Sequence, residues 1–112
     1  ERRKIANYFL ENIKNPRIIL PEPGKEGEHV WHLFVIRTKN REEIQKQLDE
    51  QQIQTLIHYP IPPHKQEAYN GMFNDSYSIT EEIHDTVISL PLWPGILSDE
   101  LNLIIQFLND CK

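Results

Sequence analysis

Several features that would place this chain in other protein classes are scarce or missing. Its one cysteine, Cys111, permits no internal disulfide and is typical of a reducing compartment. No apolar run approaches the roughly 18 residues of a membrane-spanning helix, and no signal peptide is visible. The four glycines are not spaced as in a phosphate-binding loop. We therefore expect a cytoplasmic protein without a membrane span or a P-loop.

Concentrated positive charge is also missing. The net charge is −5 at pH 7, and lysine and arginine are scattered without forming a longer basic run. Nucleic acids and anionic membranes bind proteins mainly through basic surfaces, so neither is an expected partner. With 112 residues, 38% hydrophobic and 26% charged, the composition is typical of one small globular domain.

Three apolar runs predict the strands of a sheet. In His29–Arg37 both alternating faces are mainly apolar, which indicates a strand that is covered on both sides. A second strand is predicted over residues 53–57 and a third over residues 86–90. Because helical patterns separate these runs, we predict an α+β fold with a three- to four-stranded, largely antiparallel sheet backed by helices.

Helical patterns begin at Glu1, where Ile5 and later apolar residues recur every four positions over residues 1–14. No capping residue precedes this helix, which suggests that it was cut from a longer polypeptide. Further helices are predicted from Asn40 with a capping box to Glu43, over about 63–69, over 79–85 with Thr80 as cap, and from Ser98 as cap.

Residues 58–69, HYPIPPHKQEAY, carry the densest set of hydrogen-bonding side chains. Three prolines at positions 60, 62 and 63 stiffen the backbone along which His58, Tyr59, His64 and Tyr69 are held. Two interpretations remain open. In one, this is a rigid loop that packs against apolar surface, with His58 bound to a backbone carbonyl. In the other, the four side chains line a pocket whose other walls lie elsewhere.

Other candidate chemistry is weaker. On a strand, His29 and His32 point to opposite faces, and His58 with His64 lacks a third ligand, so no metal site is expected. Ser89 has no flanking glycines of a nucleophile elbow and is interpreted as structural. Glu81, Glu82 and Asp85 are interpreted as a solvated helix face. Trp31 is expected in the core, whereas the role of Trp93, core or interface, stays open.

Three motifs in order carry a resemblance to a known family. They are the run from His29 to Arg37, the segment Ile53 to Tyr69 with its HYPxPxHxQxxY pattern, and the segment Ile88 to Ser98 with ISLPLxPxxLS. Together they resemble the C-terminal domain of the DegT/DnrJ/EryC1/StrS family of sugar aminotransferases, over nearly the whole chain. One departure is Gln52, where the family usually has glycine at a helix end.

The resemblance implies a fold-type I enzyme that depends on pyridoxal 5′-phosphate (PLP). A large N-terminal domain, absent from this chain, would carry the Schiff-base lysine and hold the cofactor, so no catalytic residue and no bound cofactor are expected among residues 1–112. The chain would be one small domain, with residues 1–14 as an inter-domain helix and residues 29–112 as the sheet-and-helix body. A homodimer is also implied.

The reaction implied is amino transfer, from glutamate, to the keto carbon of a nucleotide-linked 6-deoxy sugar. The family's substrate site maps onto His58, Tyr59, Pro60, His64 and Tyr69 of this sequence. Their side chains suit such a ligand, because imidazoles and phenols exchange hydrogen bonds with sugar hydroxyls, and Lys65 or a protonated histidine pairs with phosphate.

Two other hypotheses make different predictions. A stand-alone ligand-binding or regulatory α+β module predicts a fully polar outer surface. A structural interaction domain predicts that Trp93 and Tyr59 anchor a protein partner. The aminotransferase hypothesis instead predicts an apolar face, built partly from residues 1–14 and 58–63, that the absent domain would cover.

Overall fold

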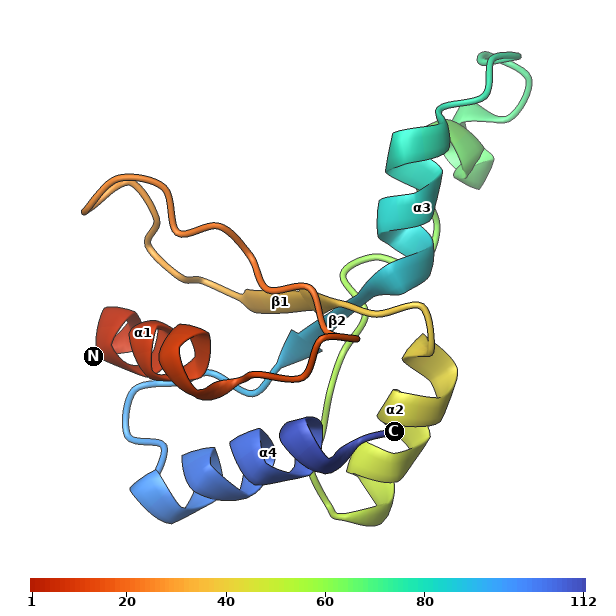
Figure 1. The fold of residues 1–112 in the computed structure, drawn as a ribbon. Coiled ribbons are helices and arrows are strands. Elements are labelled where there is room, and N and C mark those ends of the chain that lie inside the picture. Colours follow the sequence, from red (N-terminus) through yellow and green to blue (C-terminus); the bar gives the residue numbers. More distant parts are fainter.

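The computed structural model describes all of residues 1–112 and shows four α-helices around a small antiparallel sheet (Figure 1). The elements in chain order are α1 (Arg2–Asn12), β1 (Phe34–Arg37), α2 (Arg41–Glu50), the 3₁₀ helices η1 (Pro63–Lys65) and η2 (Glu67–Tyr69), α3 (Ser78–Thr86), β2 (Val87–Leu90) and α4 (Ser98–Asp110). The α+β class and the antiparallel pairing predicted from the sequence are confirmed.

The regular sheet has two strands rather than three or four. β1 and β2 pair antiparallel with Phe34 opposite Leu90 and Ile36 opposite Ile88. A single bridging residue extends the sheet at each edge, Ile19 beside β1 and Leu56 beside β2. The expected strand over residues 53–57 is thus reduced to one bridge, at Leu56.

The first predicted strand begins only at Phe34 because Trp31 leaves the extended conformation. Its φ is +52°, in the left-handed region, and its backbone N–H donates to Nδ1 of His29 at 2.9 Å. The left-handed backbone interrupts the alternation that residues 29–33 would need for a strand. The indole is still buried, as predicted, and stacks on Phe34 with ring centroids 5.4 Å apart.

The core lies where the sheet meets α1, α2 and α4. Phe9 of α1 contacts Phe34 of β1 with ring centroids 5.0 Å apart, and both side chains are fully buried. One cluster of 17 buried apolar residues continues through Leu48 of α2 and Leu108 of α4. The sheet is thereby held on a continuous apolar layer, which sets the position of β2 and of everything bonded to it.

Helix starts differ from the predictions in detail. Asn40 precedes α2 but makes no capping hydrogen bond with its side chain, and α3 begins at Ser78, two residues before the predicted cap Thr80. Ser98 is the first residue of α4 rather than its cap. There the carboxylate of Glu100 accepts the backbone N–H of Leu97 at 2.9 Å. These starts are exposed, so water satisfies the backbone groups that a side chain would otherwise cap.

Two projections rise from the body of the molecule (Figure 1). One is the loop between Ile19 and β1; the other, called the arm below, comprises residues 58–86 with η1, η2 and α3. No helix combines the length and the apolar character that crossing a membrane requires. No three His, Cys, Asp or Glu side chains are grouped so that they could hold a metal ion.

Candidate functional site

The segment that carries the predicted site residues leaves the sheet at Leu56. The backbone N–H of Leu56 donates to the carbonyl of Ser89 at 3.3 Å, and the N–H of Ser89 donates back to Leu56 at 2.8 Å. These two bonds fix where the segment starts relative to β2. From there the chain runs toward α3 and forms η1 and η2.

His58 is anchored to β2 through its ring. Its Nδ1 lies 2.8 Å from the hydroxyl oxygen of Ser89, and the side chain is half-buried. The partner is therefore a serine hydroxyl and not the backbone carbonyl that the packing interpretation supposed. The His58–Tyr59 peptide bond is cis, and the two rings meet edge to face at 5.3 Å. The other ring nitrogen of His58 has no partner within the chain.

Tyr59 faces outward while its backbone is held. Its side chain is 63% exposed, and its hydroxyl has no hydrogen-bond partner in the chain. Its carbonyl oxygen accepts a hydrogen bond from Nδ1 of His84 on α3. Since a carbonyl can only accept, Nδ1 of His84 must carry the proton. Pro60, the next residue, is exposed as well.

His64 is held to α3 by a hydrogen bond to Glu81. Its Nε2 lies 3.0 Å from Oε1 of Glu81, and the ammonium of Lys65 lies 3.2 Å from the same oxygen. The hydrogen bond from His64, followed by that from Lys65, lowers the pKa of Glu81 below its usual value. The carboxylate is thus kept ionised, and the His64 ring also packs edge to face on Tyr77 at 4.8 Å.

Tyr69 lies apart from the other predicted residues. It ends η2, is half-exposed, and makes its ring contact with Phe73 at 6.2 Å. No hydrogen bond or ring contact joins it to His58, Tyr59 or His64. The structure therefore brings His58, Tyr59, Pro60 and His64 together along one stretch bound to β2 and α3, and leaves Tyr69 on the outer part of the arm.

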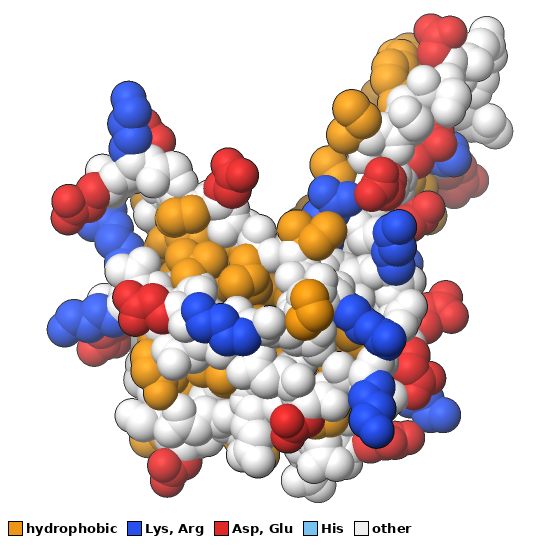
Figure 2. Space-filling view, in the orientation of Figure 1, with side chains coloured by type: hydrophobic (Ala, Val, Ile, Leu, Met, Phe, Trp, Pro, Cys, Tyr) orange, Lys and Arg blue, Asp and Glu red, His pale blue; other side chains and the backbone are white.

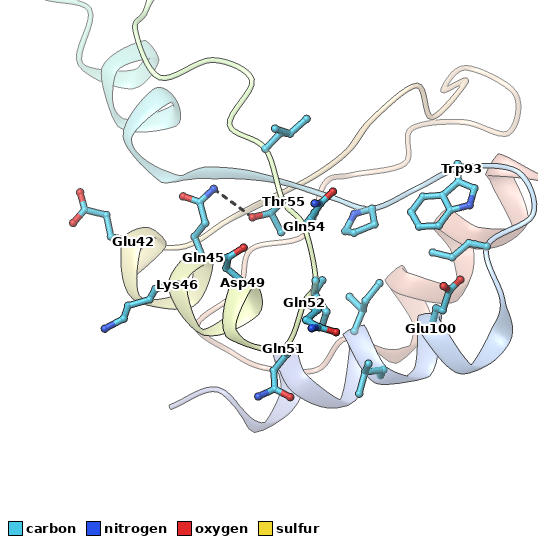
Figure 3. Close-up of a pocket in the computed structure, with 16 residues that line it drawn as sticks. Glu42, Gln45, Lys46, Asp49, Gln51, Gln52, Gln54, Thr55, Trp93 and Glu100 are labelled. Atoms are coloured by element: carbon cyan, nitrogen blue, oxygen red, sulfur yellow. Dashed lines mark hydrogen bonds between the residues drawn. The ribbon is translucent and has the colours of Figure 1, made fainter.

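The predicted residues do not line a closed pocket within this chain. A groove of about 1140 Å³ lies instead between α2, residues 51–56 and α4 (Figure 3). Trp93 stands at one end of it and is half-exposed, so this indole is not in the core. The groove is open and lined largely by polar side chains, with Gln45 bonded to Thr55 at 3.3 Å across its wall.

Sequence reasoning missed the residues that hold the segment. Glu81 was interpreted as part of a solvated helix face, and His84 was not singled out. Ser89 was interpreted as structural, and it does hold the ring of His58. Glu81 and His84 stand three apart on α3, a spacing that puts both on one face of a helix. The spacing can be read from the sequence. The sequence does not show, however, that this face of α3 contacts the proline-rich segment.

Apolar side chains are exposed on and around the arm. Figure 2 shows them on the body between the two projections and along the side of the arm that faces the other projection. Tyr59, Ile61, Met72, Ile79 and Ile83 are among the exposed residues. Of the predicted apolar face, residues 58–63 are mostly bare, whereas α1 buries Ile5 and Phe9 and leaves Tyr8 exposed.

Comparison with known proteins identifies the class first. The chain superposes on DesV of Streptomyces venezuelae, solved in complex with a ketimine intermediate, with a TM-score of 0.90, 33% identity and coverage of 97% of this chain and 30% of that one. It also superposes on NtdA of Bacillus subtilis with bound cofactor PMP (TM-score 0.84, 29% identity, 96% and 26% coverage). The fold is that of the C-terminal part of fold-type I aminotransferases.

The family follows from the sequence comparison. Residues 1–109 match the model of the DegT/DnrJ/EryC1/StrS aminotransferase family, and the chain belongs to that family. A relative from Aneurinibacillus thermoaerophilus, dTDP-3-amino-3,6-dideoxy-alpha-D-galactopyranose transaminase, is 53% identical over 108 residues, which are 96% of this chain. The chain spans about 30% of the length of this and other curated relatives that it matches.

Proposed function

We propose that the protein to which this chain belongs is a PLP-dependent aminotransferase that transfers an amino group, from glutamate, to the keto carbon of a nucleotide-linked 6-deoxy sugar. The observation that carries the proposal is 53% identity, over 96% of the chain, to a transaminase named for a dTDP-linked amino dideoxy sugar. The family match over residues 1–109 supports the same reaction class.

The cofactor would be held outside this chain. When bound, PLP supplies the aldehyde through which the amino group passes between donor and acceptor. A lysine that forms a Schiff base is normally activated in a desolvated pocket, whereas all seven lysines here are exposed. These residues do not fit a Schiff-base site. Amino transfer would therefore require the remaining part of the enzyme, and residues 1–112 alone would be inactive.

In this proposal the chain supplies one wall of the substrate site. The free hydroxyl of Tyr59 and the unpaired ring nitrogen of His58 are suited to sugar hydroxyls. Pro60 would add a rigid apolar contact. The second ring nitrogen of His64 would be free to form a hydrogen bond with the ligand. Lys65 shares its charge with Glu81, which leaves it less suited to bind a phosphate than the sequence suggested. Tyr69 would contact the ligand only from the outer part of the arm.

Two partners complete the proposal. The exposed apolar side chains of the arm are suited to cover by the large N-terminal domain and by a second subunit of a homodimer. The single cysteine supports a cytoplasmic enzyme. A stand-alone module is less well supported, since the outer surface is not uniformly polar and relatives are about three times longer. A role of Trp93 and Tyr59 as protein anchors has no observation in its favour beyond exposure.

The test uses the complete encoded polypeptide loaded with PLP. We expect it to convert a dTDP-3-keto-6-deoxyhexose and glutamate to the amino sugar and 2-oxoglutarate, measured by coupled assay and mass spectrometry. Tyr59→Phe should raise KM for the nucleotide sugar roughly tenfold, the usual scale for one lost hydrogen bond to a ligand, with KM for glutamate unchanged.

The matched control is Tyr8→Phe. The hydroxyl of Tyr8 bonds Asn102 at 2.6 Å, between α1 and α4, and no contact joins it to residues 58–64. This variant should keep the KM of the wild type. Failure of the wild type to aminate any nucleotide-linked keto sugar would refute the proposed function.

A further inference from the structure

The segment of residues 58–69 is held to the rest of the chain by side chains alone. Its own backbone bonds are local, such as Lys65 N–H to Pro62 at 2.9 Å and Tyr69 N–H to Gln66 at 2.9 Å. No backbone hydrogen bond joins it to β2 or α3. The sheet pairing that fixes its start ends at Leu56.

Apolar burial contributes little to holding this segment. Among its residues only Pro62 is buried, whereas Tyr59 and Ile61 are exposed. A segment with few buried contacts samples many conformations unless polar contacts restrain it. The side-chain hydrogen bonds therefore decide where Tyr59 and His64 lie.

Four such bonds exist, and three of them end on α3. Nδ1 of His84 donates to the carbonyl of Tyr59, and the carboxylate of Glu81 accepts from His64 and from Lys65. The fourth joins His58 to Ser89 of β2. The two α3 residues thus bind the segment on both sides of its three prolines.

The base of this arrangement is itself fixed. The guanidinium of Arg41, at the start of α2, donates to the backbone carbonyl of His84. Near the same end of α3, Arg37 of β1 bonds the hydroxyl of Thr86 at 3.0 Å and the carboxylate of Glu82 at 2.9 Å. The last two turns of α3 are therefore tied to the sheet and to α2, so His84 is a firm point of attachment.

We infer that His84 and Glu81 are positioning residues for substrate binding. They fix Tyr59 and His64 in the arrangement that receives the nucleotide sugar, without touching the sugar themselves. This inference rests on the proposed function, in which Tyr59 and His64 contact the substrate. The physical reason is that a segment ordered before binding does not lose that conformational freedom when the ligand binds.

The decisive pair of variants is His84→Leu and His84→Asn in the complete, PLP-loaded polypeptide. Leucine removes the donor, whereas the amide nitrogen of asparagine stands where Nδ1 stood and can still donate to the Tyr59 carbonyl. We expect His84→Leu to raise KM for the nucleotide sugar roughly tenfold, with kcat and KM for glutamate within about twofold of wild type. His84→Asn should recover most of the loss.

A second measurement does not depend on turnover. Hydrogen exchange of the peptide that covers residues 58–69 should be faster in His84→Leu and in Glu81→Ala, and close to wild type in His84→Asn. Peptides from β1 and α4 should exchange unchanged in all three. The matched control is His32→Leu, since His32 is exposed and its side chain makes no hydrogen bond in the chain.

The outcomes separate the inference from the proposed function. If the wild type aminates the nucleotide sugar but His84→Leu changes neither its KM nor the exchange of residues 58–69, the positioning role is overturned. The role is also overturned if His84→Asn behaves like His84→Leu. If the wild type aminates no nucleotide sugar while the exchange results hold, α3 still orders the segment and it is the proposed substrate that fails.

Discussion

At the scale of single residues, Cys111 shows how partial burial changes the reactivity of a thiol. Cys111 is the second-last residue, a position where chain ends are often poorly ordered. The structure instead places it half-buried against the core, with Sγ 3.8 Å from Oε1 of Gln47. Burial, and then the charge of Asp110, raise the pKa of the Cys111 thiol above its usual value.

The raised pKa predicts a slow thiol. In the complete polypeptide at pH 8, Cys111 should be alkylated by iodoacetamide several-fold more slowly than the same peptide after unfolding, because the thiolate is the reactive form and less of it is present. Peptide-resolved mass spectrometry measures both rates. Asp110→Asn should give a modest increase. Equal rates in the folded and unfolded states would contradict the burial of this side chain.

At the scale of elements, the end of α2 requires a residue with a positive φ, and here a residue other than glycine supplies it. Gln52 has a φ of +61°, the left-handed conformation that glycine adopts most readily. Around it, the N–H of Ile53 donates to the carbonyl of Leu48 at 2.9 Å, closing the helix end. Gln52 therefore adopts the turn conformation for which glycine is the usual residue at a helix end.

This turn predicts that Gln52→Gly stabilises the domain. Removing the side chain relieves the left-handed penalty of about 1 kcal/mol, offset in part by the greater freedom of glycine in the unfolded chain. The control is Gln51→Gly, where φ is −89°, and a loss of about 0.5–1 kcal/mol is expected. Hydrogen exchange of the β1 and β2 amides measures both. A destabilising Gln52→Gly would show that the turn does not favour glycine.

The strands illustrate the opposite case, where local pattern was insufficient. Residues 29–33 have the composition of a strand, but a left-handed Trp31 takes them out of the ladder while burying its indole. Residues 53–57 keep only the Leu56 bridge. The length of a strand depends on pairing with segments that are distant in sequence. Alternation of apolar residues predicts only that one face of the segment is buried.

At the scale of the whole molecule, the arm is the feature that most needs a partner. The side chain of Met72 is 68% exposed and that of Ile79 is 76% exposed, whereas apolar side chains of the core are almost fully buried. Exposed apolar side chains in such numbers mark surfaces that other parts of a protein cover. The chain spans about 30% of the length of the relatives that it matches, and the N-terminal domain proposed above is the occupant that we expect.

Hydroxyl-radical labelling of the complete polypeptide tests this cover. If the proposed N-terminal domain or second subunit covers the arm, Met72 and the peptide around Ile79 should be labelled slowly. Leu103 of α4 is about half-exposed and is the internal control, expected to label at a rate typical of an open surface. Rapid oxidation of Met72 would mean that the arm stays uncovered.

The sequence by itself determined the class and the ingredients of the site. Helical periodicity, the apolar runs and three ordered motifs sufficed for the α+β fold and for the family, because these depend on neighbours within a few residues or on patterns shared with relatives. The site residues His58, Tyr59, Pro60, His64 and Tyr69 remain predictions from that resemblance.

Only the tertiary structure decided what holds those residues. The orientation of α3 against β2 brings His84 to the carbonyl of Tyr59 and places the carboxylate of Glu81 beside both His64 and Lys65. It also leaves Tyr69 apart from these residues. Contacts across 17 to 31 positions of sequence arise from packing of the whole core. The local sequence pattern does not show which face of α3 contacts residues 58–69. The sequence therefore indicated only a solvated helix, whereas the structure shows that α3 holds the candidate site in place.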